Sequence, residues 1–175
     1  MLTATLLRSA THTLRRTMAT STGKAEARLA ALGYVLPTPS KPVAAYVMSV
    51  RVGNLIHTAG HLPQPAVGPL IVGKVGQELT VEEGAVAARA VGLNILATLK
   101  DALGGDLDRV VQCLKVTVFV NATPDYDKQP EVANGASDLF AAVFGDAGKH
   151  ARAAVGVGSL PRGVAVEVDA IFEIK

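Results

Sequence analysis

The chain has 175 residues, of which 49% are hydrophobic and 18% charged, and its formal net charge is +2. This length fits one domain with a single core, and the high apolar content with low charge excludes an intrinsically disordered chain. Every apolar run is much shorter than the roughly 20 residues that span a bilayer, so we expect no membrane partner.

The first 25 residues differ in composition from the rest of the chain. They are rich in Ser and Thr, and the first carboxylate is Glu26. Their basic residues are Arg8, Arg15, Arg16 and Lys24. This composition is typical of a mitochondrial presequence, so residues 1–20 are predicted to be a mitochondrial targeting leader. A disordered tail is the alternative, and a start at Met18 would give a cytoplasmic form.

The basic character of the chain belongs to this leader. Three of the 17 basic residues lie in residues 1–17, which leaves 14 basic against 15 acidic residues in the remainder. A domain with that balance lacks the electrostatic footprint of a nucleic-acid-binding protein, so a nucleic-acid partner is not expected.

The N-terminal half of the chain has clear signals for local structure. A helical pattern over 25–32 stops at Gly33, and a Pro-rich lead-in follows, so residues 21–41 are treated as one segment before the domain at 42–175. Two strands are expected at 46–52 and 55–59, joined by the hairpin dipeptide Gly53-Asn54. Residues 70–75 are predicted to form a short third strand.

The second half predicts two helices and three strands. Thr80-Val81-Glu82-Glu83 is a capping-box sequence that opens a helix ending at Gly104. One stripe of this helix is predicted to face the core, and its residues are Ala85, Ala88, Gly92, Leu96, Leu99 and Leu103. The other elements are a strand at 110–120 with a buried, inert Cys113, a helix at 130–144, and strands at 150–157 and 164–170 joined by a Pro-containing turn.

This order of elements predicts an α+β domain with a mixed β-sheet and two helices packed on one face. In the last strand, side chains alternate between the two faces. Val164, Val166, Val168 and Ala170 share one face, and Ala165, Glu167, Asp169 and Ile171 share the other. Both faces of the sheet are therefore expected to be used.

Arg152 is the first candidate for a functional residue. It shares a strand face with Ala154 and Gly156, whereas Val155 and Val157 are expected to point into the core. An Arg beside small residues stands over a hollow, and its planar fork of donors matches a carboxylate through two bonds. The pattern points to a small acid as substrate; a solvated strand Arg is the alternative.

Arg152, Leu160-Pro161 and Glu167 together resemble the signature of the Rid/YjgF family, also called the L-PSP endoribonuclease-like family, of trimeric 2-iminoacid deaminases. The likeness covers roughly residues 42 to 174. Its upstream parts are Ala44-Ala45-Tyr46, Thr58 to Pro63, Asn94 to Gly104, Asp108 to Val111 and Lys115 to Val120. The resemblance implies a chorismate-mutase-like fold, a homotrimer, and hydrolysis of 2-imino (enamine) acids such as 2-iminobutanoate and 2-iminopropanoate.

The resemblance also implies roles for individual residues. Arg152 would bind the substrate carboxylate, and Glu167 would position the attacking water and transfer protons. Five further positions would contact the substrate: Tyr46 as the aromatic cover, Gly60 through its backbone N–H, His61 in place of the usual Gln, Asn134 in the second helix, and Ala154 where close relatives often have Cys. Two of these have structural alternatives, because a core Tyr or a helix N-cap Asn would look the same. In a trimer, Arg152 and Glu167 could meet across an interface.

Neither a metal nor a cofactor is expected for this reaction, because a protonated imine beside a carboxylate is already electrophilic. His57 and His61 are four residues apart on a strand-like segment, about 13 Å, which is too far for one metal. Two other functions stay open: a non-catalytic trimer that binds small carboxylates, and the ribonuclease or translation inhibitor after which the family is also named.

Overall fold

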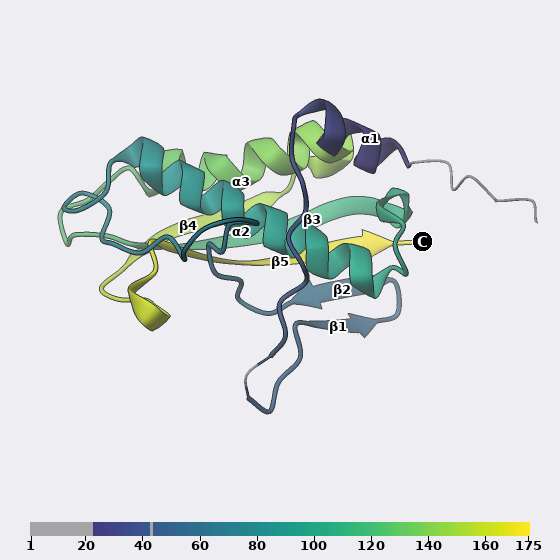
Figure 1. Ribbon diagram of the computed structural model, residues 1–175, viewed down its shortest axis with the longest axis horizontal. Coiled ribbons are helices and arrows are strands. Elements are labelled where there is room, and N and C mark those ends of the chain that lie inside the picture. The colour runs from purple at the N-terminus through teal and green to yellow at the C-terminus, as the bar shows by residue number, and fades with distance from the viewer. Residues whose placement is uncertain (1–22, 43) are drawn as a thin grey trace, which may run out of the picture.

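The computed structural model describes residues 23–42 and 44–175, so the predicted leader at 1–20 lies outside the described residues. The described chain forms a five-stranded sheet with the order β1-β2-β5-β3-β4, and two long helices cover one of its faces (Figure 1). The strands are β1 (Ser49–Val52), β2 (Leu55–Thr58), β3 (Val110–Asn121), β4 (Ala151–Val157) and β5 (Val166–Ile174). The helices are α1 (Lys24–Ala31), α2 (Val81–Ala102) and α3 (Gln129–Phe144), with short 3-10 turns η1 (Leu107–Arg109), η2 (Gly145–Gly148) and η3 (Pro161–Gly163). This is the predicted α+β architecture.

The central strand β3 fixes the position of both C-terminal strands. It pairs antiparallel with β5 on one side and parallel with β4 on the other. The last two strands therefore do not pair with each other, although they are consecutive in the chain. The segment between them, which contains η3, crosses the end of β3.

Local sequence signals account for the ends of the long helices. The capping box predicted for α2 is present: the backbone N–H of Glu83 donates to Thr80 Oγ1 at 3.2 Å, and the N–H of Thr80 donates to Glu83 Oε2 at 2.8 Å. Helix α3 has Pro130 in its first turn and ends at Gly145, whose φ of 68° favours glycine. The two helices pack so closely that a Cβ at Gly135 would overlap the carbonyl of Ala85.

The predicted strand at 70–75 does not form, and this prediction was wrong. The segment forms isolated bridges instead: Val72 pairs with Val164, and Val75 pairs with Leu79 and with Ala122. The physical reason is Gly73, whose φ of 126° is incompatible with extended pairing and turns the chain between Val72 and Val75.

Helix α1 is attached to the domain by side chains from distant parts of the chain. Asp108 accepts hydrogen bonds from the backbone N–H groups of Lys24, at 2.8 Å, and Ala25, at 2.9 Å. Arg28 Nη1 donates to the carbonyl of Val143 in α3 at 2.9 Å. Leu29 is buried in the main hydrophobic cluster. Helix α1 is thus an integral part of the packed structure.

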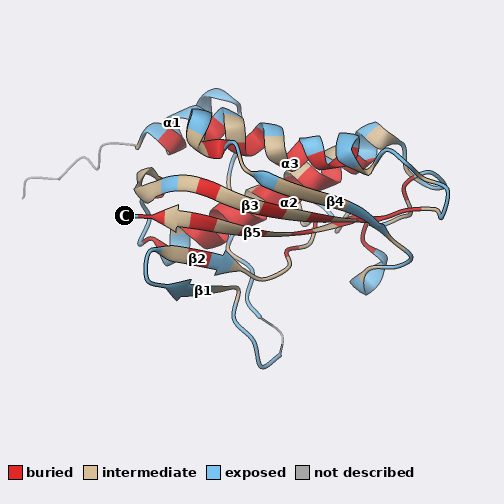
Figure 2. Ribbon diagram, turned by 180° about the vertical axis from the view of Figure 1, so that it is seen from behind, coloured by how far each residue is buried: buried red, intermediate tan, exposed pale blue. Residues whose placement is uncertain are grey.

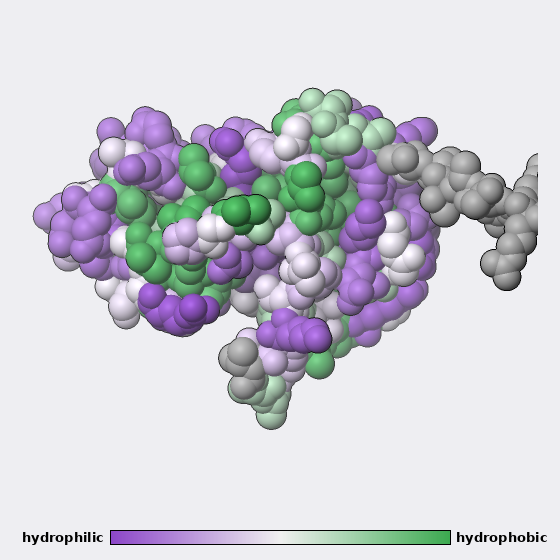
Figure 3. Space-filling model, in the orientation of Figure 1, coloured by the Kyte–Doolittle hydropathy of each residue, from purple (hydrophilic) through white to green (hydrophobic). Residues whose placement is uncertain are grey.

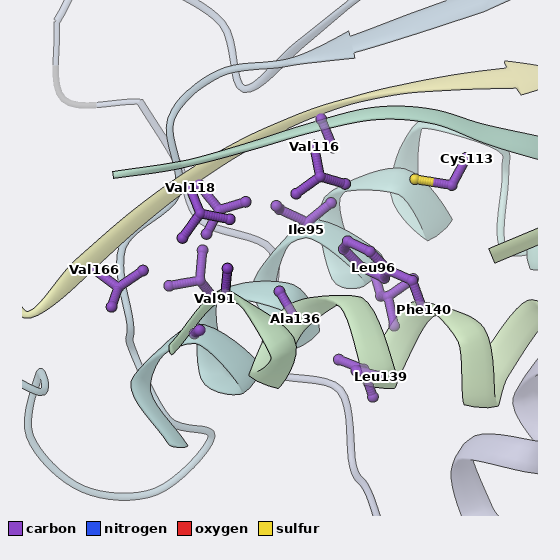
Figure 4. Close-up of a cluster of buried hydrophobic side chains, with 14 of the residues drawn as sticks. Val91, Ile95, Leu96, Cys113, Val116, Val118, Ala136, Leu139, Phe140 and Val166 are labelled. Atoms are coloured by element: carbon purple, nitrogen blue, oxygen red, sulfur yellow. The ribbon is translucent and has the colours of Figure 1, made fainter. Parts of the chain in front are cut away.

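The core lies between the sheet and the two long helices (Figure 4). Three elements supply most of the side chains that meet there. They are Val91, Ile95 and Leu96 from α2, Val116 and Val118 from β3, and Ala136, Leu139 and Phe140 from α3. Cys113 is also buried in this cluster, and burial raises the pKa of its thiol to about 12, as expected of an inert cysteine.

No helix of the described residues covers the second face of the sheet (Figure 2). Val155 lies on this open face, because its partner on β3 is Phe119 and not one of the buried valines, and 43% of its surface is exposed. The expectation that Val155 and Val157 point into the core was therefore wrong. Arg152 and Ala154 instead share the helix-covered face with their partners Val116 and Val118.

The opposite, helix-covered side of the molecule shows hydrophobic areas toward the middle of its surface, with hydrophilic side chains around much of the rim (Figure 3). Within the described chain, α2 and the other helices are too short or too polar to cross a bilayer.

Candidate functional site

Arg152 on β4 is held against helix α3. Its Nη1 donates to Asn134 Oδ1 at 2.9 Å and to Ser137 Oγ at 3.0 Å. Among the described residues, no hydrogen-bond acceptor engages its Nε or Nη2. These two groups form one edge of the guanidinium fork, and that edge matches the two oxygens of a carboxylate. The half-buried Arg152 is thus anchored through one nitrogen and can bind an acid through the others.

Asn134 is not a helix N-cap. Helix α3 begins at Gln129 with Lys128 in the cap position, so Asn134 lies in its second turn. Its side-chain oxygen accepts the bond from Arg152. The N-cap alternative is excluded, and the side chain serves instead to orient the guanidinium.

Two residues that the sequence reasoning missed extend this arrangement. Ser137 Oγ lies 3.0 Å from His150 Nε2, and His150 Nδ1 lies 2.7 Å from the carbonyl oxygen of Gly148. A sequence signal existed for both, because Ser137 is three residues after Asn134 on the same side of a helix, and His150 directly precedes β4, two residues before Arg152. We call Asn134, Ser137, His150 and Arg152 the Arg152 cluster.

Glu167 lies on the open face of the sheet, opposite Phe119 of β3. Its carboxylate lies directly against Gly60: a Cβ at position 60 would overlap Glu167 Oε1. Burial, and secondly the negative charge of Asp169, raise the pKa of Glu167 above its ordinary value. A carboxyl group of that kind is suited to accept and return protons near neutral pH.

Tyr46 lies three residues before β1, the strand that pairs with β2 just ahead of Gly60. The N–H of Ala59 donates to the carbonyl of Met48 at 2.9 Å, which continues the β1–β2 pairing past the strands toward residues 46 and 60. Tyr46 has 47% of its surface exposed, so it is not the core tyrosine of the alternative interpretation. We call Gly60 and Glu167 the Glu167 cluster.

His61 points away from this cluster. Only 1% of its surface is exposed, and both ring nitrogens have partners: Nδ1 lies 2.7 Å from the Ala59 carbonyl and Nε2 lies 2.8 Å from Thr98 Oγ1 in α2. Burial lowers the pKa of His61, so the ring is neutral at pH 7. This geometry argues against the predicted ligand contact through the imidazole and gives the ring a packing role.

Ala154 follows Arg152 on the same face of β4 and packs against the edge of the core. Its methyl group leaves space beside the guanidinium, but it offers no polar side-chain contact. His57 is exposed, whereas His61 is buried, so the two imidazoles do not converge. In the part of the chain that the structure describes, no three His, Cys, Asp or Glu side chains are grouped as metal ligands.

The two clusters are separate within one chain. Strand β3 lies between β4 and β5, and the register places Arg152 level with Ala170, three residues from Glu167. Two strand spacings and a three-residue offset give a Cα separation of about 14 Å. Arg152 and Glu167 also lie on opposite faces of the sheet, so they cannot contact the same small molecule within one chain.

Comparisons with known proteins agree on one family. Residues 26–168 match the model of the family described as "YjgF/chorismate_mutase-like, putative endoribonuclease". Protein TCP17 of Trypanosoma cruzi is 48% identical over 156 residues, which cover 89% of this chain and 97% of that protein. The crystal structure of Atu1372, a protein of unknown function from Agrobacterium tumefaciens, has 42% identity and a TM-score of 0.81, with 86% of this chain and 92% of that chain covered.

A more distant relative has a named activity. The 2-iminobutanoate/2-iminopropanoate deaminase of Dermatophagoides farinae is 25% identical over 140 residues, which cover 79% of this chain and 93% of that protein. The likeness therefore extends over nearly the whole of the deaminase.

Proposed function

We propose that this chain, which belongs to the YjgF/chorismate mutase-like (Rid) family, hydrolyses 2-imino acids to 2-keto acids and ammonia at a site shared between two subunits of a homotrimer. The observation that carries the proposal is the Arg152 guanidinium, which is anchored through Nη1, while Nε and Nη2 have no acceptor among the described residues. The likeness to a 2-iminobutanoate/2-iminopropanoate deaminase supports the choice of substrate class.

The chemistry needs little beyond a held substrate, a water molecule and a proton carrier. Arg152 binds the carboxylate and fixes the imine carbon in place. Glu167 removes a proton as the oxygen of water bonds to that carbon, and the proton then passes to the nitrogen. The carbon–nitrogen bond then breaks as the new hydroxyl gives its proton to Glu167, so that ammonia leaves and the carbonyl group of a 2-keto acid forms. The raised pKa of Glu167 favours both halves of this proton transfer.

A shared site follows from the position of the two clusters. Since Arg152 and Glu167 lie on opposite faces of one sheet, a second copy has to bring its Arg152 cluster to the open face that carries Glu167. Val155 is an exposed apolar residue on that open face, which supports burial of the face in an assembly. A closed ring of three copies makes each contact identical and gives three equivalent sites.

Ammonia release is the direct test of the reaction. The substrates are 2-iminobutanoate and 2-iminopropanoate, generated in the cuvette by an amino-acid oxidase, with the spontaneous hydrolysis rate subtracted. We expect the parent chain to accelerate ammonia release and to elute with the mass of a trimer in light scattering. Binding of 2-oxobutanoate without acceleration would instead identify a non-catalytic carboxylate-binding protein.

A mixing experiment tests whether the site is shared. Arg152→Ala and Glu167→Gln variants are each expected to be inactive alone. When the two are co-assembled from equal amounts, about a quarter of the interfaces combine an intact Arg152 with an intact Glu167, so about a quarter of the parent activity returns. Full inactivity of a verified mixed assembly would contradict a shared site.

A further inference from the structure

The hydrogen bonds that link Arg152 through Ser137 and His150 to Gly148 have a fixed order of donors and acceptors. An Arg guanidinium has only donors, so Ser137 Oγ accepts the bond from Nη1. At the other end, the Gly148 carbonyl is only an acceptor, so His150 Nδ1 carries the proton and donates to it. A neutral imidazole with its proton on Nδ1 has a free lone pair on Nε2. The Ser137 hydroxyl therefore donates to Nε2, which completes this series of hydrogen bonds.

From these hydrogen bonds we propose that Ser137 and His150 are positioning residues for Arg152. They hold its guanidinium with Nε and Nη2 turned toward the substrate carboxylate. The inference rests on the proposed function for its substrate, but the geometry behind it does not. His150 is itself fixed, because its ring packs edge-on against Phe140 at 6.0 Å between centroids. Ser137 is thereby held with one lone pair toward Arg152, which a freely rotating hydroxyl would not maintain.

The surroundings of His150 keep its ring neutral, so that Nε2 stays an acceptor for Ser137. Partial burial of the ring, and secondly the positive charge of the neighbouring Arg152, hold the pKa of His150 below its ordinary value. The adjacent Lys149 also adds positive charge, although its ammonium pairs with Asp146 at 2.8 Å. The neutral ring accepts from Ser137 throughout the neutral range.

Amide substitutions at position 150 separate the two functions of the ring. Gln places its amide oxygen near the position of Nε2 and can accept from Ser137. Asn places its amide group near Nδ1, so it can reach Gly148 but offers Ser137 no acceptor. We expect Ser137→Ala and His150→Asn to raise the KM for 2-iminobutanoate about 3- to 10-fold, with kcat changed less than 2-fold, which is the effect of one lost hydrogen bond. His150→Gln should stay close to the parent.

The control is Ser159→Ala, because Ser159 is exposed in the loop after β4. Thermal melting of every variant separates folding from positioning. The dissociation constant of 2-oxobutanoate should follow KM across the series. Equal KM values for the Asn and Gln variants, or a Ser137→Ala variant that matches the parent, would overturn the inference while leaving the deaminase activity intact.

Nitrogen-15 NMR tests the hydrogen bonds between Arg152, Ser137 and His150 independently of any activity. The parent should show His150 as the Nδ1–H tautomer, and Ser137→Ala should shift the Arg152 side-chain signals more than Ser159→Ala does. An Nε2–H tautomer, or unchanged Arg152 signals, would refute the positioning role of Ser137 and His150. If the parent neither binds 2-oxobutanoate nor releases ammonia, the proposed function fails, and the NMR result still decides whether Ser137 and His150 fix Arg152.

Discussion

Replacement of Arg152 by Lys is predicted to remove most of the activity although the positive charge remains. In the parent, Asn134 and Ser137 engage Nη1 alone, which leaves two nitrogens for the substrate. A Lys ammonium has three donors on one nitrogen, and the same two oxygens would take two of them. One bond to the carboxylate remains where the Arg made two.

The loss of one hydrogen bond between charged groups costs about 1.5–3 kcal/mol. At about 1.4 kcal/mol for each factor of ten, we expect kcat/KM of Arg152→Lys to fall about 10- to 150-fold. Arg152→Ala loses both bonds and the charge, so it should fall further. The assay is ammonia release from enzymatically generated 2-iminobutanoate, with 2-oxobutanoate affinity measured by calorimetry.

Arg51→Lys is the matched control, because Arg51 is exposed on β1 and donates to Gly53 within its own hairpin. Circular dichroism melts show whether each variant is folded. A folded Arg152→Lys protein with kcat/KM within 2-fold of the parent would refute the proposal that the guanidinium fork binds the carboxylate.

Four further outcomes are expected. Glu167→Gln should lower kcat about 10²- to 10⁴-fold, with Asp169→Asn as the control. Because burial, and secondly Asp169, raise the pKa of Glu167, the kcat/KM of the parent should fall as the pH drops through that raised pKa. A kcat/KM that does not change at acid pH would contradict the role of Glu167 as the base. Gly60→Ala should lower activity because the new methyl group overlaps the Glu167 carboxylate, and the difference in ammonia release from the parent measures this. Asp108→Ala should lower the free energy of unfolding by about 1–2 kcal/mol in urea melts, because α1 loses its only side-chain cap in the described structure. A fusion of residues 1–25 to a fluorescent protein should co-localise with mitochondria, and a diffuse cytosolic signal would reject the leader.

The elements with strong local signals could be predicted from the sequence. Thr80 and Glu83 form a capping box through neighbours three residues apart, and Gly53-Asn54 forms its turn through its own dihedral preferences. Such features depend little on the rest of the fold. The strand expected at 70–75 shows the limit, because the apolar residues around Gly73 have a strand pattern that the backbone of the glycine interrupts.

The orientation of β4 could not be predicted in the same way. The apolar character of Val155 and Val157 predicts that they point into the core, because apolar side chains usually point inward. Helix α3 covers the other face, where Arg152 bonds to Asn134 and Ser137 and where the side chain of Gln129 lies over Gly156. The small residues of β4 therefore face the helix, and the valines face outward, where the single chain leaves them exposed.

The separation of Arg152 and Glu167 depends on the pairing of both strands with β3. The sequence places them on two successive strands joined by a short loop, a spacing that would fit two neighbours on one face. In the structure β3 lies between those strands and pairs Arg152 with Val116 but Glu167 with Phe119. Val116 and Phe119 are three residues apart on β3, so their side chains lie on opposite faces of the sheet. A shift of one residue in either pairing would bring both side chains to the same face. Because the register excludes that arrangement, a chemistry that needs both groups requires a second copy, and the mixed assembly of Arg152→Ala and Glu167→Gln subunits tests whether the two groups meet across an interface between copies.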